Sequence, residues 1–284
     1  MDRFEGKVAV ITGAASGFGR EFALKGAALG MKLVLADIDA TALDATVTSL
    51  RERGAEARGV RTDVSNPADV DALARATLDA FGGAHLLFNN AGVGAGGFIW
   101  ESSANDWQWV FGVNVMGVAN GIRAFTPIML AQNEPAHIVN TASVAGLLAA
   151  PAMGVYNASK HAVVAMTETL HHDLRLARAS VGVSLLCPAF VPTGIADAER
   201  ARPCALVNDE EMTASQKLAA RQLAKAVEHG KLSARDVAEL TFDAIRANRF
   251  YVVTHPNIMP SVQLRLDDIA QLRDPSDPMS LKSR

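Results

Sequence analysis

The sequence predicts an α/β fold, a doubly wound and mostly parallel sheet of seven strands with helices on both faces. Short apolar runs rich in β-branched residues alternate with longer helical patterns over most of the chain. The runs are continuously apolar, as strands buried on both faces are, and a glycine-rich turn follows the first of them. At 284 residues and 49% hydrophobic, the chain can bury a substantial core, and we expect one domain over 1–284.

The strands and helices follow one another in order along the chain. The expected strands are Val8–Thr12, Lys32–Ala36, Ala57–Thr62, His85–Asn89, His137–Thr141, Val183–Cys187 and Tyr251–Thr254. The expected helices are Phe18–Leu29, Thr41–Arg53, Ala68–Phe81, Asp106–Leu130, Met153–Ala177 and Ala234–Asn248. Asp39 precedes the second helix as a capping residue, and Asn66-Pro67 opens the third with a cap and a first-position proline. This alternation is typical of a doubly wound sheet.

Two stretches fall outside the alternation. Residues 195–232 contain two short helical patterns, Ile195–Arg200 and Ala214–Glu228. We expect this insertion to cover the substrate and to close over it, and the alternative is an ordinary surface helical hairpin. Residues 261–284 are expected to form a C-terminal tail, which is polar and contains two prolines from Asp274 onward.

Composition and charge exclude several classes of function. A formal charge of -3 and a pI near 6.2 provide no basic field for nucleic acid or an anionic membrane. The opening residues Met1–Lys7 do not resemble a signal peptide, and no apolar run approaches the roughly 18 residues that span a bilayer. Cys187, Cys204 and seven scattered histidines show neither disulfide nor metal-ligand spacing. We therefore expect a cytoplasmic protein with no nucleic-acid, membrane or metal partner.

The turn after the first expected strand reads Thr12-Gly13-Ala14-Ala15-Ser16-Gly17-Phe18-Gly19. Glycines there let the backbone approach a pyrophosphate, and the helix N-terminus supplies N–H donors and a positive dipole. Glycine is favoured in any strand-to-helix turn, so the position after the first strand of an α/β domain carries the inference. The spacing is GxxxGxG rather than the common GxGxxG.

The second expected strand ends near Asp37, about 20 residues beyond the glycine-rich turn, where an acid can bind both ribose hydroxyls of an adenosine and repel a 2′-phosphate. Asp39 is better explained as a helix cap, and Ser16 is neutral where a basic residue could bind that phosphate. These residues favour NAD over NADP. Arg20 and Arg58 are interpreted as surface charges, and Arg58 is kept as an alternative 2′-phosphate ligand.

Polar residues also follow the third and fourth strands, at the edge where open α/β sheets bind ligands. Asp63-Val64 and Asn89-Asn90-Ala91-Gly92 occupy these places, and each has a simpler interpretation as a turn cap or a loop. Asn114 lies inside a helical pattern, where asparagine is a poor helix former. It indicates a buried amide with a defined hydrogen bond, or a purely structural role.

Tyr156 and Lys160 are four residues apart in Tyr156-Asn157-Ala158-Ser159-Lys160, so they share a helix face. The nearby ammonium is expected to lower the Tyr156 pKa from its usual value of about 10, which makes the phenol a general acid/base near neutral pH. Such a pair is also common on a solvated helix face. Ser143, thirteen positions upstream, offers a second hydroxyl.

In this order the motifs resemble the short-chain dehydrogenase/reductase family, which has a Rossmann-type sheet. The resemblance covers about residues 4 to 194 and resumes near 231. It is carried by Thr12-Gly13-x-x-x-Gly17-x-Gly19, Asp63, Asn90-Ala91-Gly92, Asn114, Ser143, Tyr156-x-x-x-Lys160 and Pro188-Ala189-Phe190-Val191-Pro192-Thr193, the last similar to PGxVxT.

The resemblance implies a catalytic group of Asn114, Ser143, Tyr156 and Lys160. Tyr156 would exchange a proton with the carbonyl or alcohol oxygen, and Ser143 would hydrogen-bond the same oxygen. Lys160 would lower the Tyr156 pKa and bind the nicotinamide ribose, and Asn114 would hold a water linking Lys160 to solvent. The implied cofactor contacts are Gly13, Ser16, Gly17, Phe18, Gly19, Asp37, Ile38, Asp63, Val64, Asn90, Ala91, Gly92, Tyr156, Lys160, Pro188, Val191 and Thr193.

One residue departs from the family pattern. Ala189 stands where the family has glycine, and the bulky Phe190 follows it. If the loop needs a positive φ at this place, alanine would cost stability or shift the loop.

The expected activity is NAD-dependent interconversion of a hydrophobic secondary alcohol and ketone, aromatic ones included. The candidate pocket residues are apolar, namely Val93-Gly94, Val144-Ala145, Leu147-Leu148, Met153 and Phe190. The alternatives are an NADP-preferring carbonyl reductase and a catalytically silent dinucleotide-binding regulator, which would have little need of Ser143, Tyr156 and Lys160 together. The resemblance also implies a homodimer or homotetramer, packed through helices around 106–130 and 153–177.

Overall fold

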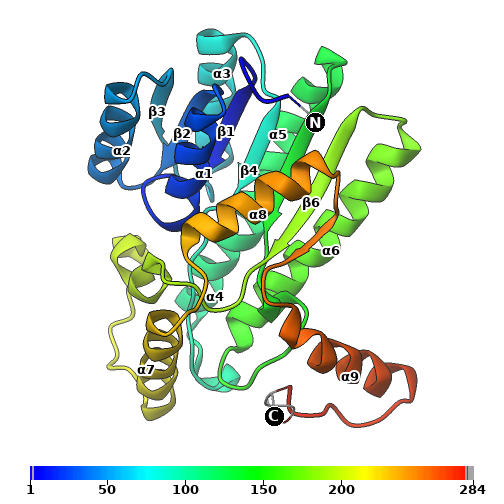
Figure 1. The fold of residues 1–284 in the computed structure, drawn as a ribbon. Helices are drawn as coiled ribbons and strands as arrows, with labels where there is room; N and C mark the ends of the chain where they lie inside the picture. Colours follow the sequence, from blue (N-terminus) through cyan, green and yellow to red (C-terminus); the bar gives the residue numbers. More distant parts are fainter. Residues whose placement is uncertain (2, 279, 281–284) are drawn as a thin grey trace.

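A parallel sheet of seven strands forms the centre of the protein. The computed structural model describes residues 1, 3–278 and 280. The strands are β1 (Val8–Thr12), β2 (Lys32–Asp37), β3 (Ala57–Arg61), β4 (Leu86–Asn89), β5 (Ala136–Thr141), β6 (Val181–Cys187) and β7 (Tyr251–Val253). They lie in the order β3-β2-β1-β4-β5-β6-β7, and every pairing between them is parallel (Figure 1). This confirms the predicted doubly wound sheet.

Helices cover both faces of the sheet, as Figure 1 shows. One face carries α1 (Gly17–Ala28), α2 (Ala40–Glu52) and α8 (Ala234–Arg246), and the other carries α3 (Pro67–Phe81), α5 (Gly117–Gln132) and α6 (Gly154–Leu176). Successive residues of β1 alternate between two separate apolar cores, with Ala9 and Ile11 in one and Val8 and Val10 in the other. Because both faces are buried, the central strands β1 and β4 are apolar up to their last residue rather than at every second position. The edge strand β3 differs, since it contains Arg58 and Arg61.

Further elements lie beyond the carboxyl ends of the strands (Figure 1). They are the helices α4 (Ala104–Phe111), α7 (Ala214–Glu228) and α9 (Met259–Ala270), a π-helical turn at Gly112–Met116, and 3-10 turns at Ile99–Glu101, Val144–Gly146, Gly194–Ala201, Cys204–Leu206 and Pro256–Ile258. Most of them surround the edge of the sheet where the predicted site residues lie.

Three expected elements differ from the structure. The helix expected over Asp106–Leu130 is continuous, but its middle, Gly112–Met116 around the buried Asn114, is a π-helical turn between α4 and α5. The helix expected over Ile195–Arg200 is a 3-10 turn with a kink at Asp197. The expected tail, 261–284, contains most of α9, where Met259, Val262, Leu266 and Ile269 recur at helical spacing. Residues 279 and 281–284 of that tail lie outside the described residues.

The predicted helix starts are confirmed. The Asp39 side chain accepts a hydrogen bond from the N–H of Ala42 at 3.0 Å and caps α2. The Asn66 side chain accepts one from the N–H of Ala68 at 3.0 Å, and Pro67 is the first residue of α3. Across the described residues, no helix combines the length and the apolarity needed to cross a membrane.

Candidate active site

The order of the strands collects the predicted site residues at one edge of the sheet. Parallel strands end at the same edge, and in open α/β sheets ligands bind there at the point where the strand order reverses, here between β1 and β4. Asp37 is the last residue of β2 and Asp63 follows β3, both on one side of this point. Ser143 and Thr193 follow β5 and β6 on the other side. A ligand that crosses the switch point would meet both groups.

The glycine-rich turn packs closely against the loop that follows β4. Gly13 has a φ of +66°, and a Cβ on it would lie 2.9 Å from the Cα of Ala91. A Cβ on Gly19 would lie only 2.0 Å from the carbonyl oxygen of Gly13. The Thr12 hydroxyl accepts hydrogen bonds from the N–H groups of Asn90 at 2.9 Å and Ala91 at 3.1 Å. Turn and loop therefore form one surface that admits no side chain at these two glycines.

The amino end of α1 is open to an anion. Within the described chain, its N-cap residue Ser16 makes no side-chain capping hydrogen bond, and its first turn contains no acidic residue. The N–H groups and the dipole at this end can therefore bind a pyrophosphate. The ring of Phe18 packs toward Phe22, at a centroid distance of 6.4 Å, so Phe18 would offer its backbone to a ligand.

Asp37 is held beside the glycine-rich turn. Its Oδ2 accepts a hydrogen bond from the N–H of Ala15 at 2.9 Å, and its Oδ1 accepts one from the N–H of Asp39 at 3.1 Å. Arg58 pairs with Val34, three residues before the end of β2. The arginine that lies beside Ser16 is Arg200, which the sequence does not predict. Arg200 belongs to a segment far from Ser16 in sequence, and only the fold brings the two residues together.

The polar residues after β3 and β4 make structural hydrogen bonds as well as facing the edge. Asp63 Oδ1 accepts from the N–H of Ser65 at 2.9 Å and from its hydroxyl at 2.6 Å, which is the turn-capping role of the simpler interpretation. The Asn90 amide donates to the carbonyl oxygen of Thr12 at 3.0 Å and accepts from the Thr141 hydroxyl at 3.3 Å. Asn90 thereby connects the ends of β1, β4 and β5.

Ser143 begins the 3-10 turn Val144–Gly146 at the end of β5. Its buried hydroxyl accepts a hydrogen bond from the N–H of Ala145 at 3.1 Å and lies 3.3 Å from the carbonyl oxygen of Pro188, to which it donates. These contacts place the hydroxyl between the ends of β5 and β6.

Tyr156 and Lys160 share one face of α6, as predicted. Lys160 Nζ lies 5.6 Å from the centroid of the Tyr156 ring and donates to the carbonyl oxygen of Thr141 at 2.9 Å. Burial lowers the pKa of the Lys160 ammonium to about 8. Burial also raises the pKa of Tyr156, and a hydrogen bond with Ser143 opposes this only in part. The predicted fall in the Tyr156 pKa is therefore wrong for the protein alone, because desolvation of the phenolate is the larger effect.

Asn114 is a buried crosslink. Its Oδ1 accepts from the N–H of Val93 at 2.9 Å, and its Nδ2 donates to the carbonyl oxygen of Val93 at 2.9 Å and to the Ser159 hydroxyl at 3.0 Å. The amide thus ties the loop after β4 to α6, next to Lys160. A defined hydrogen-bonding task was expected of this residue; its role in holding a water stays a prediction.

The loop after β6 returns to the glycine-rich turn. A Cβ on Gly17 would lie 3.3 Å from the Cβ of Thr193, so Thr193 lies against the turn. Val191 is buried, and Pro188 receives the hydrogen bond from Ser143. Ala189 is not one of the residues with a positive φ, so alanine in place of the family's glycine causes no left-handed strain here.

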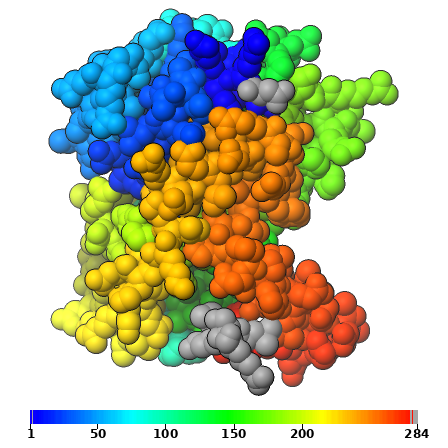
Figure 2. Space-filling view, viewed as in Figure 1, coloured from blue at the N-terminus to red at the C-terminus, as the bar shows by residue number. Residues whose placement is uncertain are grey.

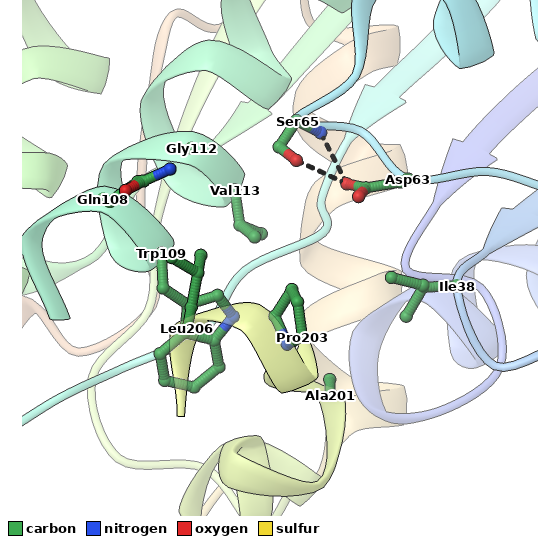
Figure 3. Close-up of a pocket in the computed structure, with 10 residues that line it drawn as sticks. All are labelled: Ile38, Asp63, Ser65, Gln108, Trp109, Gly112, Val113, Ala201, Pro203 and Leu206. Atoms are coloured by element: carbon green, nitrogen blue, oxygen red, sulfur yellow. Dashed lines mark hydrogen bonds between the residues drawn. The ribbon is translucent and has the colours of Figure 1, made fainter. Parts of the chain in front are cut away.

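A cavity of about 190 Å³ opens beside the ends of β2 and β3 (Figure 3). Its lining consists of Ile38, Asp63, Ser65, Gln108, Trp109, Gly112, Val113, Ala201, Pro203 and Leu206. Apolar walls with a carboxylate at one end suit a flat aromatic ring with a polar edge, such as adenine. Ala201, Pro203 and Leu206 carry no recognisable sequence signal and reach the cavity only through the path of the chain after β6. Among the described residues, no cluster of His, Cys, Asp or Glu could hold a metal ion.

The fold and this edge define a class, the dinucleotide-binding α/β oxidoreductases. The family model described as short chain dehydrogenase matches residues 7–203. The CLA biosynthesis dehydrogenase/reductase of Lactiplantibacillus plantarum is 38% identical over 271 residues, which is 95% of each chain. The C alpha-dehydrogenase of Sphingobium sp. (strain NBRC 103272 / SYK-6) is 33% identical over 100% of this chain and 92% of that relative.

A solved structure is also very similar. It is a short chain dehydrogenase/reductase from Burkholderia phymatum in complex with NAD, 70% identical, with a TM-score of 0.97 over 99% of this chain and 100% of that one. The chain therefore belongs to the short-chain dehydrogenase/reductase family.

Proposed function

We propose that this protein is an NAD-dependent oxidoreductase that interconverts a hydrophobic secondary alcohol and the corresponding ketone. The observation that carries the proposal is the convergence of Ser143, Tyr156 and Lys160 at the edge of the sheet. A Cβ on Gly92 would lie 3.5 Å from Lys160 Nζ, so the group borders the loop that packs on the glycine-rich turn. A carbonyl oxygen bound there would meet two hydroxyl donors.

NAD, when bound, supplies the hydride for reduction and accepts it in oxidation. The amino end of α1 would hold its pyrophosphate, Asp37 its adenosine ribose, and the cavity beside Ile38 and Asp63 its adenine. The Burkholderia phymatum structure, 70% identical and solved with NAD, supports this choice of cofactor.

The proton chemistry belongs to Tyr156. Because burial raises the pKa of Tyr156, the phenol is protonated at neutral pH and is ready to donate to a carbonyl oxygen. Ser143 would donate a hydrogen bond to the same oxygen and orient it. In oxidation Tyr156 must first lose its proton, and the Lys160 ammonium beside the ring would stabilise the phenolate.

The surroundings of Tyr156 support an apolar substrate. A Cβ on Gly94 would lie 3.6 Å from the Tyr156 ring, so a backbone stretch without side-chain bulk borders the phenol. The expected pocket residues Val93 and Leu148 are buried, and Phe190 after β6 is 44% exposed. The relatives from Lactiplantibacillus plantarum and Sphingobium sp. are a dehydrogenase/reductase and a dehydrogenase by name, which agrees with the reaction type. Assembly as a homodimer or homotetramer stays a prediction.

The kcat/KM for reduction of apolar ketones is expected to be at least ten-fold higher than that for 2-keto acids. Gly94, which borders the Tyr156 ring, offers no charged side chain, so a substrate carboxylate placed there would be desolvated without an ion pair. The measurement is NADH oxidation with matched aryl-alkyl ketones, dialkyl ketones and 2-keto acids. Faster turnover of the keto acids would contradict the proposed substrate class.

The second candidate is an NADP-preferring reductase, favoured by one observation: the Arg200 guanidinium lies 3.5 Å from the Ser16 hydroxyl, beside the expected ribose position. Arg200 also pairs with Asp39 at 3.2 Å, and the Asp37 carboxylate would repel a 2′-phosphate.

Replacing Asp37 with alanine is expected to weaken NADH binding by about ten-fold or more, because hydrogen bonds to a charged group are lost. The preference for NADH over NADPH should narrow at the same time. Titration of both reduced cofactors against wild type and variant measures the effect. A wild-type preference for NADPH would refute the assigned role of Asp37.

A further inference from the structure

The chain segment after β6 lies beside the ends of β2 and β3. Residues 194–208, called the clasp below, contribute Ala201, Pro203 and Leu206 to the cavity described above. Figure 3 shows these residues on one side of the cavity and Ile38 and Asp63 on the other. Ile38 and Asp63 follow β2 and β3, on the adenosine side of the switch point. The expected role of this stretch was to cover the substrate.

Arg202 fixes the middle of the clasp. Its guanidinium donates to Asp106 at 2.8 Å and to both carboxylate oxygens of Glu199, and it stacks 4.1 Å above the Trp109 ring. The side chains of Arg202 and Asp106 are only 4% and 5% exposed. Arg202 also donates to the carbonyl oxygen of Leu206 at 3.1 Å. A buried, fully hydrogen-bonded pair of this kind holds its segment in one position, because separating it would leave a charge unpaired.

Arg200 connects the clasp to the amino-terminal elements through an exposed contact. Its guanidinium pairs with Asp39 at 3.2 Å and donates to the Ser16 hydroxyl at 3.5 Å. The side chains of Arg200 and Asp39 are 50% and 38% exposed, so the pair is weak and can open readily. In Figure 2 the yellow-green part of the chain lies below the blue atoms of the amino-terminal elements, with α7 beneath it.

The second half of the insertion packs at a different place. The Ser215 hydroxyl of α7 accepts from the N–H of Phe98 at 2.9 Å, and Glu101 accepts from Thr213 at 2.6 Å. A Cβ on Gly96 would lie 2.8 Å from the Cβ of Ala219. α7 therefore covers the loop after β4, on the Tyr156 side, so the two halves of 195–232 face opposite halves of the site.

We propose that the clasp is the outer wall of the adenosine site and that Arg200 is its latch, so that NAD exchange requires the Arg200–Asp39 contact to open. The inference rests on the proposed use of NAD. Because Arg202 is anchored, the opening is confined to the stretch between Thr193 and Arg202. Arg200 is a positioning residue in this scheme, and Leu206 and Pro203 would line the place of the adenine.

The test is the binding of NADH to the full chain without substrate, with the affinity from a fluorescence titration and the dissociation rate from stopped-flow displacement by excess NAD. Arg200→Ala is expected to raise the dissociation rate about three-fold, which is the size of effect of an exposed ion pair. Leu206→Ala, which removes part of the wall, is expected to weaken affinity about five-fold. Arg123→Ala is the matched control, because Arg123 and Asp71 form a similarly exposed pair away from the cavity lining, and its dissociation rate should stay at the wild-type value.

The variant Asp39→Asn distinguishes a latch role of Arg200 from a direct contact between Arg200 and the cofactor. Asparagine keeps the acceptor that caps α2, while the ion pair with Arg200 is lost. A latch predicts the same rise in dissociation rate for Asp39→Asn, for Arg200→Ala and for the double variant. An effect of Arg200→Ala without one of Asp39→Asn would overturn the latch, since Arg200 would then act on NADH itself. Unchanged rates in Arg200→Ala together with unchanged affinity in Leu206→Ala would overturn the clasp while leaving the proposed function intact. Failure of the wild type to bind NADH would instead refute the proposed function.

Discussion

Replacing Tyr156 with phenylalanine is expected to lower kcat for ketone reduction by about 10³-fold, the range in which a positioned general acid acts. The change removes one hydroxyl and keeps the ring, so the packing of α6 and the position of Lys160 should be preserved. NADH affinity is therefore expected to stay within about two-fold of the wild type. Steady-state rates and a fluorescence titration of NADH measure the two quantities.

The chain contains its own control for this experiment. It has two tyrosines, and the other, Tyr251, is 50% exposed and donates its hydroxyl to Glu168 at 2.7 Å. Tyr251→Phe should leave kcat at the wild-type value. The wild-type rate of alcohol oxidation should also rise with pH, because burial raises the Tyr156 pKa and the base form must be generated first. Full activity of Tyr156→Phe would sink the assignment of the proton donor.

The sheet was predictable because local chemistry and tertiary packing agree along most of the chain. Burial on both faces makes a strand such as Val8–Thr12 apolar up to its last residue, and this pattern can be read without knowing the neighbouring strands. The starts of α2 and α3 depend on side chains that bond two or three residues away, at Asp39 and Asn66. The π-helical turn was not predictable, because it accommodates hydrogen bonds of Asn114 to Val93 and Ser159 in other elements.

The contrast between local sequence patterns and tertiary contacts also explains which site residues could be predicted. Asp37, Asp63 and Ser143 sit at the ends of parallel strands, and topology alone brings them to one edge. Arg200 and Leu206 reach this edge through a segment without regular periodicity, so their contacts with Asp39 and with the cavity are visible only in three dimensions. The direction of the Tyr156 pKa was wrong for a related reason. Helical spacing reveals the neighbouring Lys160 but not how deeply the phenol is desolvated.

Replacing Lys160 with methionine is expected to abolish turnover and at the same time to stabilise the protein at neutral pH. The ammonium is almost fully buried, and burial lowers its pKa from 10.5 to about 8. That difference corresponds to a cost of about 3 kcal/mol for keeping the charge in the folded state. Methionine removes this cost but also the hydrogen bond from the charged ammonium to Thr141, worth about 2 kcal/mol, so the net gain is about 1 kcal/mol.

The difference in stability between Lys160→Met and the wild type is expected to change with pH. Below pH 8 Lys160 is charged in both the folded and the unfolded chain, so the wild type carries the full cost and the variant is more stable. Between pH 8 and 10.5 the folded wild type releases its proton while the unfolded chain still holds one, so wild-type stability rises relative to the variant. Above about pH 10.5 the burial cost is gone and only the hydrogen bond still separates the two proteins.

Urea unfolding of cofactor-free wild type and Lys160→Met at pH 7, 9 and 10 measures this difference. The control is Lys32→Met. Lys32 is the first residue of β2 and lies over the Phe81 ring, and the stability difference between this variant and the wild type should not change in this way with pH. A variant that is less stable than the wild type at pH 7 would show that burial of the Lys160 ammonium does not destabilise the folded protein. Stabilisation combined with lost turnover would instead show that this lysine is kept for its chemistry, at the expense of the free energy of unfolding.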